Sequence, residues 1–220
     1  MKKLIILLLS SLFLMGCGDY REESINERIE WSHTWIVNTA DTLLPRILVI
    51  GDSHVENYYP HITKTFKDRA VVCKFTSSKS LGDPILSDQI ELVIKQFDFD
   101  IITFNNGLHG RKYSEEQYGK HLPELMKLIE SVSDACVILV NTTPARRSGN
   151  LEEFQDFNSK VVERNRIFRE FAIEKDIPTV NLYMLGEKST RYYRNDGIHF
   201  NAEGVKEEAR LISEAIQKFI

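Results

Sequence analysis

The sequence contains little cysteine, with three residues among 220. Cys73 in "AVVCKF" and Cys136 in "DACVILV" lie in apolar stretches that resemble buried strands, which favours unpaired, chemically idle thiols over a disulfide. No group of cysteine and histidine residues has the spacing of metal ligands. The sequence therefore predicts no metal site.

An excess of positive charge is also missing. There are 28 lysine and arginine residues against 32 aspartate and glutamate residues, for a formal net charge of -4. This balance is unlike the basic surface of a nucleic-acid-binding protein, so we exclude nucleic acid as a partner. The length and a hydrophobic content of 42% are sufficient for one globular domain with a real core.

Only the N-terminus carries a long hydrophobic run. "MKKLIILLLSSLFLMGC" has two lysines, then an apolar stretch over residues 4–14 that is short for a bilayer span and typical of a signal peptide. Its ending resembles a bacterial lipobox, which implies cleavage before Cys17 and lipidation of that residue. We therefore expect residues 1–17 to be the signal peptide of an exported lipoprotein, held at the periplasmic or cell-surface face of a membrane. An uncleaved anchor and an ordinary secretory signal are the alternatives.

The segment after the lipobox is polar and charged. We expect residues 18–44 to tether the lipidated end to a domain spanning residues 45–220. Trp31 and Trp35 are four residues apart, a spacing that favours a short packed helix, with a binding rim as the alternative.

From Pro45 onward, short apolar strands alternate with helical patterns. We expect strands at residues 46–51, 70–75, 100–104, 135–140 and 177–183, and helices at 55–69, 84–97, 114–131, 151–175 and 201–219. All-apolar strands in this alternation predict a parallel sheet covered on both faces, a three-layer α/β/α domain with five strands in a flavodoxin-like arrangement. Ligands of such sheets bind outside the carboxyl ends of the strands.

Residues suited to serine hydrolysis follow several of these strands. Ser53 follows the first strand, and Asp196 and His199 come shortly after the fifth. Serine hydrolysis needs an exposed hydroxyl as nucleophile, an imidazole to take its proton and a carboxylate to orient the imidazole. Ser53, His199 and Asp196 are our candidates for these three roles.

Hydrolysis also needs hydrogen-bond donors for the oxyanion. The backbone N–H groups of Ser53 and Gly82 are candidates, together with a side-chain amide from Asn105 or Asn106. The helix after Ser53 would point its N-terminal N–H groups toward the same place.

Four blocks of the sequence resemble the SGNH (GDSL-like) hydrolase superfamily. They are "GDS" at 51–53, "SLGDP" at 80–84, "FNNGLHG" at 104–110 and "DGIH" at 196–199. The third block differs from the usual Gly-x-Asn-Asp and is similar to an Asn-x-Gly-Leu-His variant, an alignment that favours Asn105 as the donor, whereas counting from the strand end leaves Asn106 open. The resemblance implies ester hydrolysis through an acyl-enzyme, often the deacetylation of carbohydrates, without a metal or an organic cofactor.

Other polar residues near these blocks have ordinary explanations. His54 is expected at a solvent-exposed helix start, and His109 at the rim of the site rather than as a rival base. Arg146 and Arg147 are expected in a solvated loop, with pairing to a substrate carboxylate as the alternative.

The function predicted from these residues is a serine esterase that cleaves an acyl ester, preferably an acetyl ester on a carbohydrate. Two alternatives use the same scaffold. One is an O-acyltransferase with the same three residues. The other is a non-catalytic glycan-binding lipoprotein whose sugar-stacking rim would comprise Trp31, Trp35, Tyr58 and Tyr59.

Overall fold

The computed structural model describes residues 25–40 and 43–220. The expected signal peptide and Cys17 lie outside the described residues. In the described part of the chain, no helix combines the length and apolar character needed to cross a membrane. Cys73 is buried and Cys136 half-buried, and both are free thiols, as expected.

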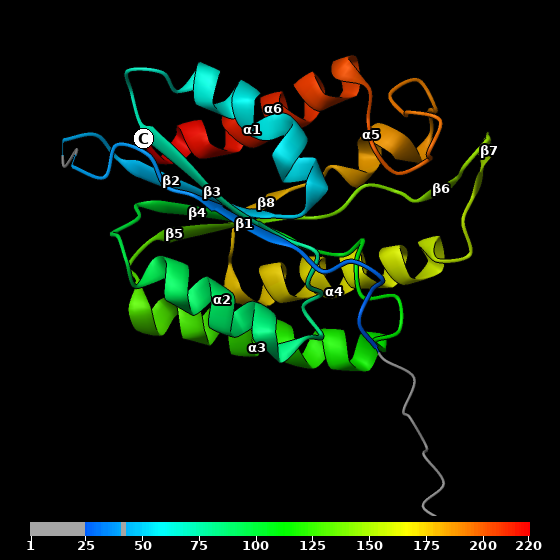
Figure 1. Cartoon of the computed structure of the whole chain (residues 1–220), viewed down its shortest axis with the longest axis horizontal. Helices are drawn as coiled ribbons and strands as arrows, with labels where there is room; N and C mark the ends of the chain where they lie inside the picture. Colours follow the sequence, from blue (N-terminus) through cyan, green and yellow to red (C-terminus); the bar gives the residue numbers. More distant parts are fainter. Residues whose placement is uncertain (1–24, 41–42) are drawn as a thin grey trace, which may run out of the picture.

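A six-stranded sheet forms the centre of the domain (Figure 1). Its spatial order is β1-β3-β2-β4-β5-β8. The strands are β1 (Ser32–Trp35), β2 (Arg46–Gly51), β3 (Val71–Ser77), β4 (Ile101–Asn105), β5 (Cys136–Val140) and β8 (Thr179–Val180). The last five pair in parallel and in the flavodoxin-like order, which confirms the predicted fold class.

The sixth strand, β1, was not predicted. It lies antiparallel to β3 at the edge of the sheet, in register from Ser32 opposite Ser77 to Trp35 opposite Lys74. The expected helix around the two tryptophans is therefore wrong. All four residues of β1 are exposed, so the strand has no apolar pattern of its own and depends on the backbone partners that β3 offers.

Helices cover both faces of the sheet (Figure 1). On one face lie α1 (Ser53–Thr65), α5 (Tyr183–Glu187) and α6 (Ala202–Ile216), which is followed by a short 3-10 helix over Gln217–Phe219. On the other face lie α2 (Pro84–Ile94), α3 (Glu115–Val132) and α4 (Asn158–Lys175). Side chains of β2 alternate between the two cores: Ile47 and Val49 pack toward α1 and α6, and Leu48 and Ile50 toward α2 and α3.

A small hairpin precedes α4, where the sequence predicts helix from residue 151. Strands β6 (Arg146–Arg147) and β7 (Asn150–Phe154) pair in antiparallel orientation, and α4 begins only at Asn158. The turn between them contains Gly149 with φ of 76°. A left-handed residue of this kind suits a tight hairpin turn, which here displaces the start of the helix.

The sheet has one point where the strand order reverses. The chain passes from β2 to β3 on one side and then returns to β4 on the other side of β2. The crevice outside the carboxyl ends of β2 and β4 is where such folds bind ligands. The residues that follow these two strands therefore define the region of interest.

Candidate active site

Ser53 lies at the turn between β2 and α1. The turn is tight, because a Cβ atom on Gly51 would lie 2.5 Å from the Val55 Cγ2 atom. Asp52 caps α1 by accepting a hydrogen bond of 2.9 Å from the His54 N–H group. Ser53 is thus the first residue of the helix, where the free N–H groups and the helix dipole favour negative charge.

Ser53, His199 and Asp196 form a continuous chain of hydrogen bonds. The Ser53 Oγ atom lies 2.8 Å from the His199 Nε2 atom, and the His199 Nδ1 atom lies 2.9 Å from the Asp196 Oδ2 atom. The structure therefore brings together three side chains from opposite ends of the domain, at distances suited to proton transfer from the hydroxyl.

Asp196 also orders the turn that carries His199. Its Oδ1 atom accepts hydrogen bonds of 2.8 Å from the backbone N–H groups of both Ile198 and His199. Burial raises the pKa of the Asp196 carboxyl, but these bonds and the His199 ring outweigh burial and hold the pKa below its ordinary value. One ionised carboxylate therefore both shapes the turn and orients the imidazole.

The His199 turn packs against the backbone of β6. Gly197 has φ of 74°, and a Cβ atom there would lie 2.2 Å from the Arg146 carbonyl oxygen. The Arg146 N–H group in turn donates to the Gly197 carbonyl oxygen at 2.7 Å. Glycine is the residue that this contact and this backbone conformation both allow.

Arg146 is a structural residue and not part of a solvated loop. It is only 4% exposed, and its guanidinium donates to the carbonyl oxygens of Gly186, Glu187 and Leu151. These contacts occupy four of its five N–H donors, so the structure supports a structural role for Arg146 rather than pairing with a substrate carboxylate. The adjacent Arg147 is exposed and pairs with Glu153 at 3.0 Å.

The predicted oxyanion donors differ in how their hydrogens are used. The Gly82 N–H group donates to the Ser80 Oγ atom at 3.3 Å, so its one hydrogen is engaged. The Asn105 Nδ2 atom donates at 3.0 Å to two carbonyl oxygens, those of Val140 and Asn141, so both of its hydrogens are engaged.

Asn106 binds the loop that carries Gly82. Its Oδ1 atom accepts from the Leu81 N–H group at 3.0 Å, and its Nδ2 atom donates at 3.0 Å to the Lys79 carbonyl oxygen. No described residue accepts the second hydrogen of that amide. Of the two side chains, only Asn106 therefore has an amide hydrogen without an acceptor among the described residues, and neither asparagine lines the cleft at Ser53.

His54 is buried and not at an exposed helix start. It is 2% exposed, and its Nδ1 atom lies 2.6 Å from the Oε1 atom of Glu208, which is fully buried. Sequence reasoning overlooked Glu208 in the charged stretch "KEEAR". The available signal was its place on the apolar stripe of α6, three residues after Val205 and four before Ile212.

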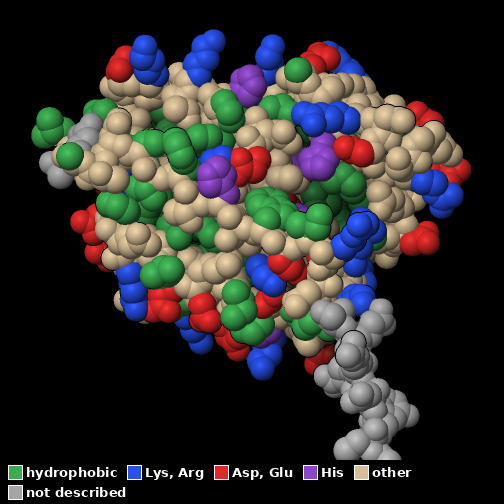
Figure 2. Space-filling view, in the orientation of Figure 1, with side chains coloured by type: hydrophobic (Ala, Val, Ile, Leu, Met, Phe, Trp, Pro, Cys, Tyr) green, Lys and Arg blue, Asp and Glu red, His purple; other side chains and the backbone are tan. Residues whose placement is uncertain are grey.

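A cleft of about 510 Å³ opens in front of Ser53 and His199. In Figure 2, histidine, acidic and basic side chains gather around the hollowed centre of the face shown. Apart from Ser53 and His199, the cleft is lined by Ile25, Asn26, Glu27, Arg28, Leu108, His109, Arg111, Lys112 and Ile198. The segment expected to be only a tether therefore supplies one wall of this cleft.

His109 lies at the rim, as expected, and is bound by this wall. Its Nδ1 atom lies 2.9 Å from the Glu27 Oε2 atom, and the other oxygen of Glu27 accepts from the Gly110 N–H group at 3.0 Å. Burial lowers the pKa of His109, but Glu27 outweighs it and the net pKa is raised. Glu27, the one carboxylate among the described residues that line the cleft, is thus already engaged by protein groups.

Two of the aromatic residues proposed for a sugar-stacking rim are unsuited to it. Tyr58 is fully buried, and Tyr59 is half-buried with its hydroxyl donating to the Val72 carbonyl oxygen at 2.9 Å. Trp35 is 53% exposed, and Trp31 packs edge-on against His109 at 6.2 Å between ring centroids. The four-residue rim that the alternative, glycan-binding function would need is therefore not present.

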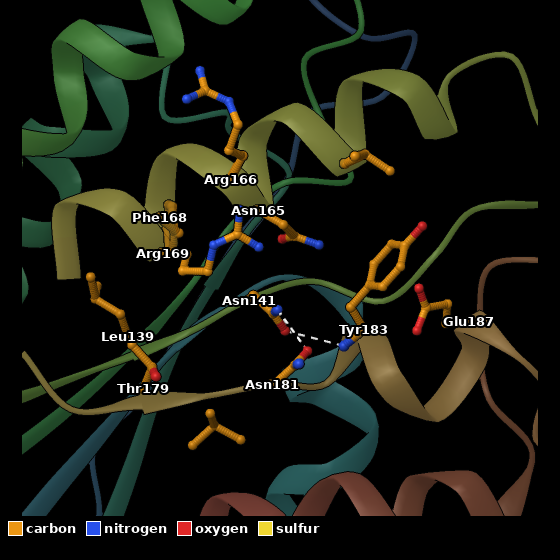
Figure 3. Close-up of a pocket in the computed structure, with 12 residues that line it drawn as sticks. Leu139, Asn141, Asn165, Arg166, Phe168, Arg169, Thr179, Asn181, Tyr183 and Glu187 are labelled. Atoms are coloured by element: carbon orange, nitrogen blue, oxygen red, sulfur yellow. Dashed lines mark hydrogen bonds between the residues drawn. The ribbon is translucent and has the colours of Figure 1, made fainter. Parts of the chain in front are cut away.

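A second cavity, of about 470 Å³, lies away from Ser53, between α4 and the segment from β8 to α5 (Figure 3). Its main polar groups bind one another. Asn141 donates to the Asn181 side chain at 2.8 Å and accepts from the Tyr183 N–H group at 3.1 Å. None of the candidate active-site residues lines it.

Comparison with known proteins identifies relatives only through their structures. No protein-family model matches the chain, and no curated protein sequence matches it. Several solved structures, however, are similar to this chain. A protein assigned as an acylhydrolase from Bacteroides fragilis NCTC 9343 superimposes with a TM-score of 0.65 at 20% identity, over 82% of this chain and 92% of its own.

Two further structures give the same result. A GDSL-like lipase from Bacteroides thetaiotaomicron VPI-5482 has a TM-score of 0.61 and 21% identity, over 80% of this chain and 89% of its own. The acetylxylan esterase Axe2 from Geobacillus stearothermophilus has a TM-score of 0.64 and 14% identity, over 78% of this chain and 94% of its own. At such low identity these likenesses establish the fold alone. The chain therefore has the fold of the GDSL-like lipases, acylhydrolases and acetylxylan esterases, in agreement with the SGNH-like blocks in its sequence.

Proposed function

We propose that this protein is a serine ester hydrolase with Ser53 as nucleophile, His199 as general base and Asp196 as the residue that orients His199. The observation that carries this proposal is the unbroken chain from the Ser53 hydroxyl through both ring nitrogens of His199 to the Asp196 carboxylate. The opening of the cleft directly onto Ser53 and His199 gives an ester access to the hydroxyl.

The reaction follows from this geometry. The Ser53 Oγ atom attacks the ester carbonyl carbon while its proton passes to His199 Nε2. The tetrahedral intermediate collapses to an acyl-serine, and the leaving alkoxide takes the proton from His199. Water then attacks the acyl-serine and gives a proton to the same nitrogen. The second tetrahedral intermediate collapses to the carboxylic acid as His199 returns that proton to the Ser53 Oγ atom. Asp196 stabilises the imidazolium in both steps without taking the proton.

The oxyanion would be held by the Ser53 N–H group at the helix N-terminus and the second amide hydrogen of Asn106, and the Gly82 N–H group would join them by leaving the Ser80 hydroxyl to which it donates. In support, Asn106 already binds the loop from Lys79 to Leu81, so its amide and Gly82 are held together. Asn105 would have to break a buried hydrogen bond to serve the same role.

This assignment predicts different effects for the two asparagines. Asn106→Ala is expected to lower kcat by roughly 10²- to 10³-fold, because one donor to the oxyanion is lost. Asn105→Ala is expected to lower Tm, because two buried carbonyl oxygens lose their donor, and to retain more of kcat. Steady-state kinetics with thermal melting of both variants checks this, and a larger loss of kcat in Asn105→Ala would reverse the assignment.

For the substrate we propose an acetyl ester on a carbohydrate. The names of the acetylxylan esterases that share the fold support a sugar as the alcohol. The cleft adds a preference. Arg28 and Arg111 line it, and the one carboxylate among its described lining residues, Glu27, is bound by His109 and Gly110. A cationic rim of this kind favours acidic sugars over neutral ones.

Acetate release tests both parts of the proposal. The wild-type protein is expected to release acetate from acetylated carbohydrates and 4-nitrophenol from its acetate ester, with acidic glycans preferred at low salt. The preference is expected to shrink as ionic strength rises, because the rim charges are exposed and screened. If neither acetate from acetylated carbohydrates nor 4-nitrophenol from its acetate ester is released, the esterase proposal is contradicted.

The same experiment separates the two alternative functions. An O-acyltransferase would pass the acetyl group to an excess of acceptor sugar rather than to water, which product analysis detects. A non-catalytic binding protein would show neither turnover nor covalent labelling by a fluorophosphonate.

We also propose that the protein is an exported lipoprotein attached to a membrane through Cys17. The lipobox-like ending of the N-terminal apolar run supports this location. Incorporation of labelled palmitate that disappears in Cys17→Ser is the expected result, and equal incorporation in both proteins would contradict it.

A further inference from the structure

We propose that His54 and Glu208 form a buried clamp that positions His199 relative to Ser53. This inference rests on the proposed esterase function and assigns a role to two residues outside the catalytic chain. The clamp joins α1 to α6, the two elements next to the nucleophile and the base.

The connection is short at both ends. His54 directly follows Ser53 in α1, and α6 begins three residues after His199. Glu208 lies in the second turn of α6, and its Oε1 atom is 2.6 Å from the His54 Nδ1 atom. A single hydrogen-bonded pair therefore fixes the helix that presents Ser53 against the helix that follows His199.

His54 also touches the base itself. Its ring stacks on the His199 ring with 5.7 Å between centroids and 25° between planes. The Phe200 ring meets it edge-on at 5.7 Å, and the Thr143 Oγ1 atom lies 3.4 Å from its Nε2 atom. Because His54 is confined on these sides, a shift of its ring would be passed to the His199 ring.

The charges around His54 suit this role. It faces Glu208 from α6, Asp52 from the turn before α1, and His199 and the Ile198 backbone from the loop before α6. Burial lowers the pKa of His54, but Glu208, Asp52 and the Ile198 carbonyl outweigh it and raise the pKa to about 9. Burial also raises the pKa of Glu208, so the pair holds a proton between the His54 Nδ1 atom and the Glu208 Oε1 atom, while the His54 Nε2 atom faces Thr143.

Stability alone does not explain the pair. The Glu208 Oε2 atom and the nearby Tyr58 hydroxyl are buried without a hydrogen-bond partner among the described residues. Burying two charges with an oxygen left unsatisfied is costly, and apolar residues of similar size often replace such pairs at no loss of stability. The pair is therefore not explained by its contribution to stability, whereas a role in positioning His199 does explain it.

Replacement of the whole pair tests the proposal. His54→Leu combined with Glu208→Leu is expected to keep Tm near or above the wild-type value while kcat falls by roughly 10- to 100-fold and KM changes little. The single variant Glu208→Gln keeps a hydrogen bond to His54, so its kcat is expected to stay within about threefold of the wild-type value. Ile216→Ala, in the same helix two turns beyond Glu208, is the matched control: it should lower Tm without lowering kcat per folded molecule.

A measurement independent of turnover completes the test. The His199 ring proton bound to Asp196 is expected as a downfield NMR resonance in the wild type and to be lost or broadened in the double variant. Wild-type kcat with an unchanged resonance in the double variant would overturn the clamp. An inactive wild type that shows the same spectral difference would instead contradict the esterase function and leave the positioning role supported.

Discussion

Replacement of Ser53 by alanine is expected to lower ester hydrolysis by at least about 10³-fold and to abolish fluorophosphonate labelling. The hydroxyl 2.8 Å from the His199 imidazole is the nucleophile in our proposal, and no acyl-enzyme forms without it. Folding should be almost unaffected, because Ser53 caps nothing with its side chain and Asp52 continues to cap α1. Progress curves of acetate release and gel detection of the labelled protein give the measurement.

Ser131→Ala is the matched control for this experiment. Ser131 is exposed in α3, and its hydroxyl donates only to the Leu128 carbonyl oxygen, so turnover and labelling should equal the wild-type values. Turnover that survives in Ser53→Ala would show that the chemistry uses another group and would refute the assignment of the nucleophile.

Replacement of Arg164 by methionine is expected to destabilise the domain strongly. Arg164 is fully buried in α4, and its guanidinium donates to the carbonyl oxygens of Gly107, His109 and Gly110 at 3.0, 2.6 and 3.0 Å. Its removal leaves three buried carbonyl oxygens with fewer donors, at a cost of roughly 3–5 kcal/mol. Because domains of this size are stable by only about 5–15 kcal/mol, a large fall of Tm should follow.

The loop bound by Arg164 also follows Asn106, so the surviving folded fraction should show reduced kcat. Arg166→Met provides the control on the same helix. Arg166 is exposed and pairs only with Glu163 and Glu170 on its own helix, so its loss should change Tm little. Equal melting temperatures for the two variants would contradict the structural role given to Arg164.

The parts of the site that could be predicted are those encoded next to parallel strands. Ser53 follows the unmistakable apolar run of β2, and Asp196 and His199 lie in the loop that comes after β8 and α5. The fifth strand, expected over residues 177–183, is only Thr179–Val180, but the carboxyl ends of parallel strands still meet at one edge. Their convergence therefore followed from local patterns. Asn105 and Asn106 could not be distinguished in the same way, because neighbouring residues differ only in which remote carbonyl oxygens they reach.

The features that sequence reasoning missed depend on distant partners. Strand β1 has no buried residue and exists through its pairing with β3, more than thirty residues further along the chain. Arg146 looks like a loop cation until Gly186 and Glu187 are seen to surround it. Glu208 is the exception, because a glutamate on an apolar helical stripe predicts a buried partner even before that partner is known.

The wall that Ile25 to Arg28 contribute to the cleft has a consequence for the proposed lipoprotein esterase. Eight residue steps separate Cys17 from Ile25, and a chain of that length reaches at most about 30 Å even when fully extended. A lipid on Cys17 would thus keep the mouth of the cleft close to the bilayer, within the reach of this short segment. The proposed esterase would then act on polymers that lie close to the membrane surface and would not reach polymers further away in solution.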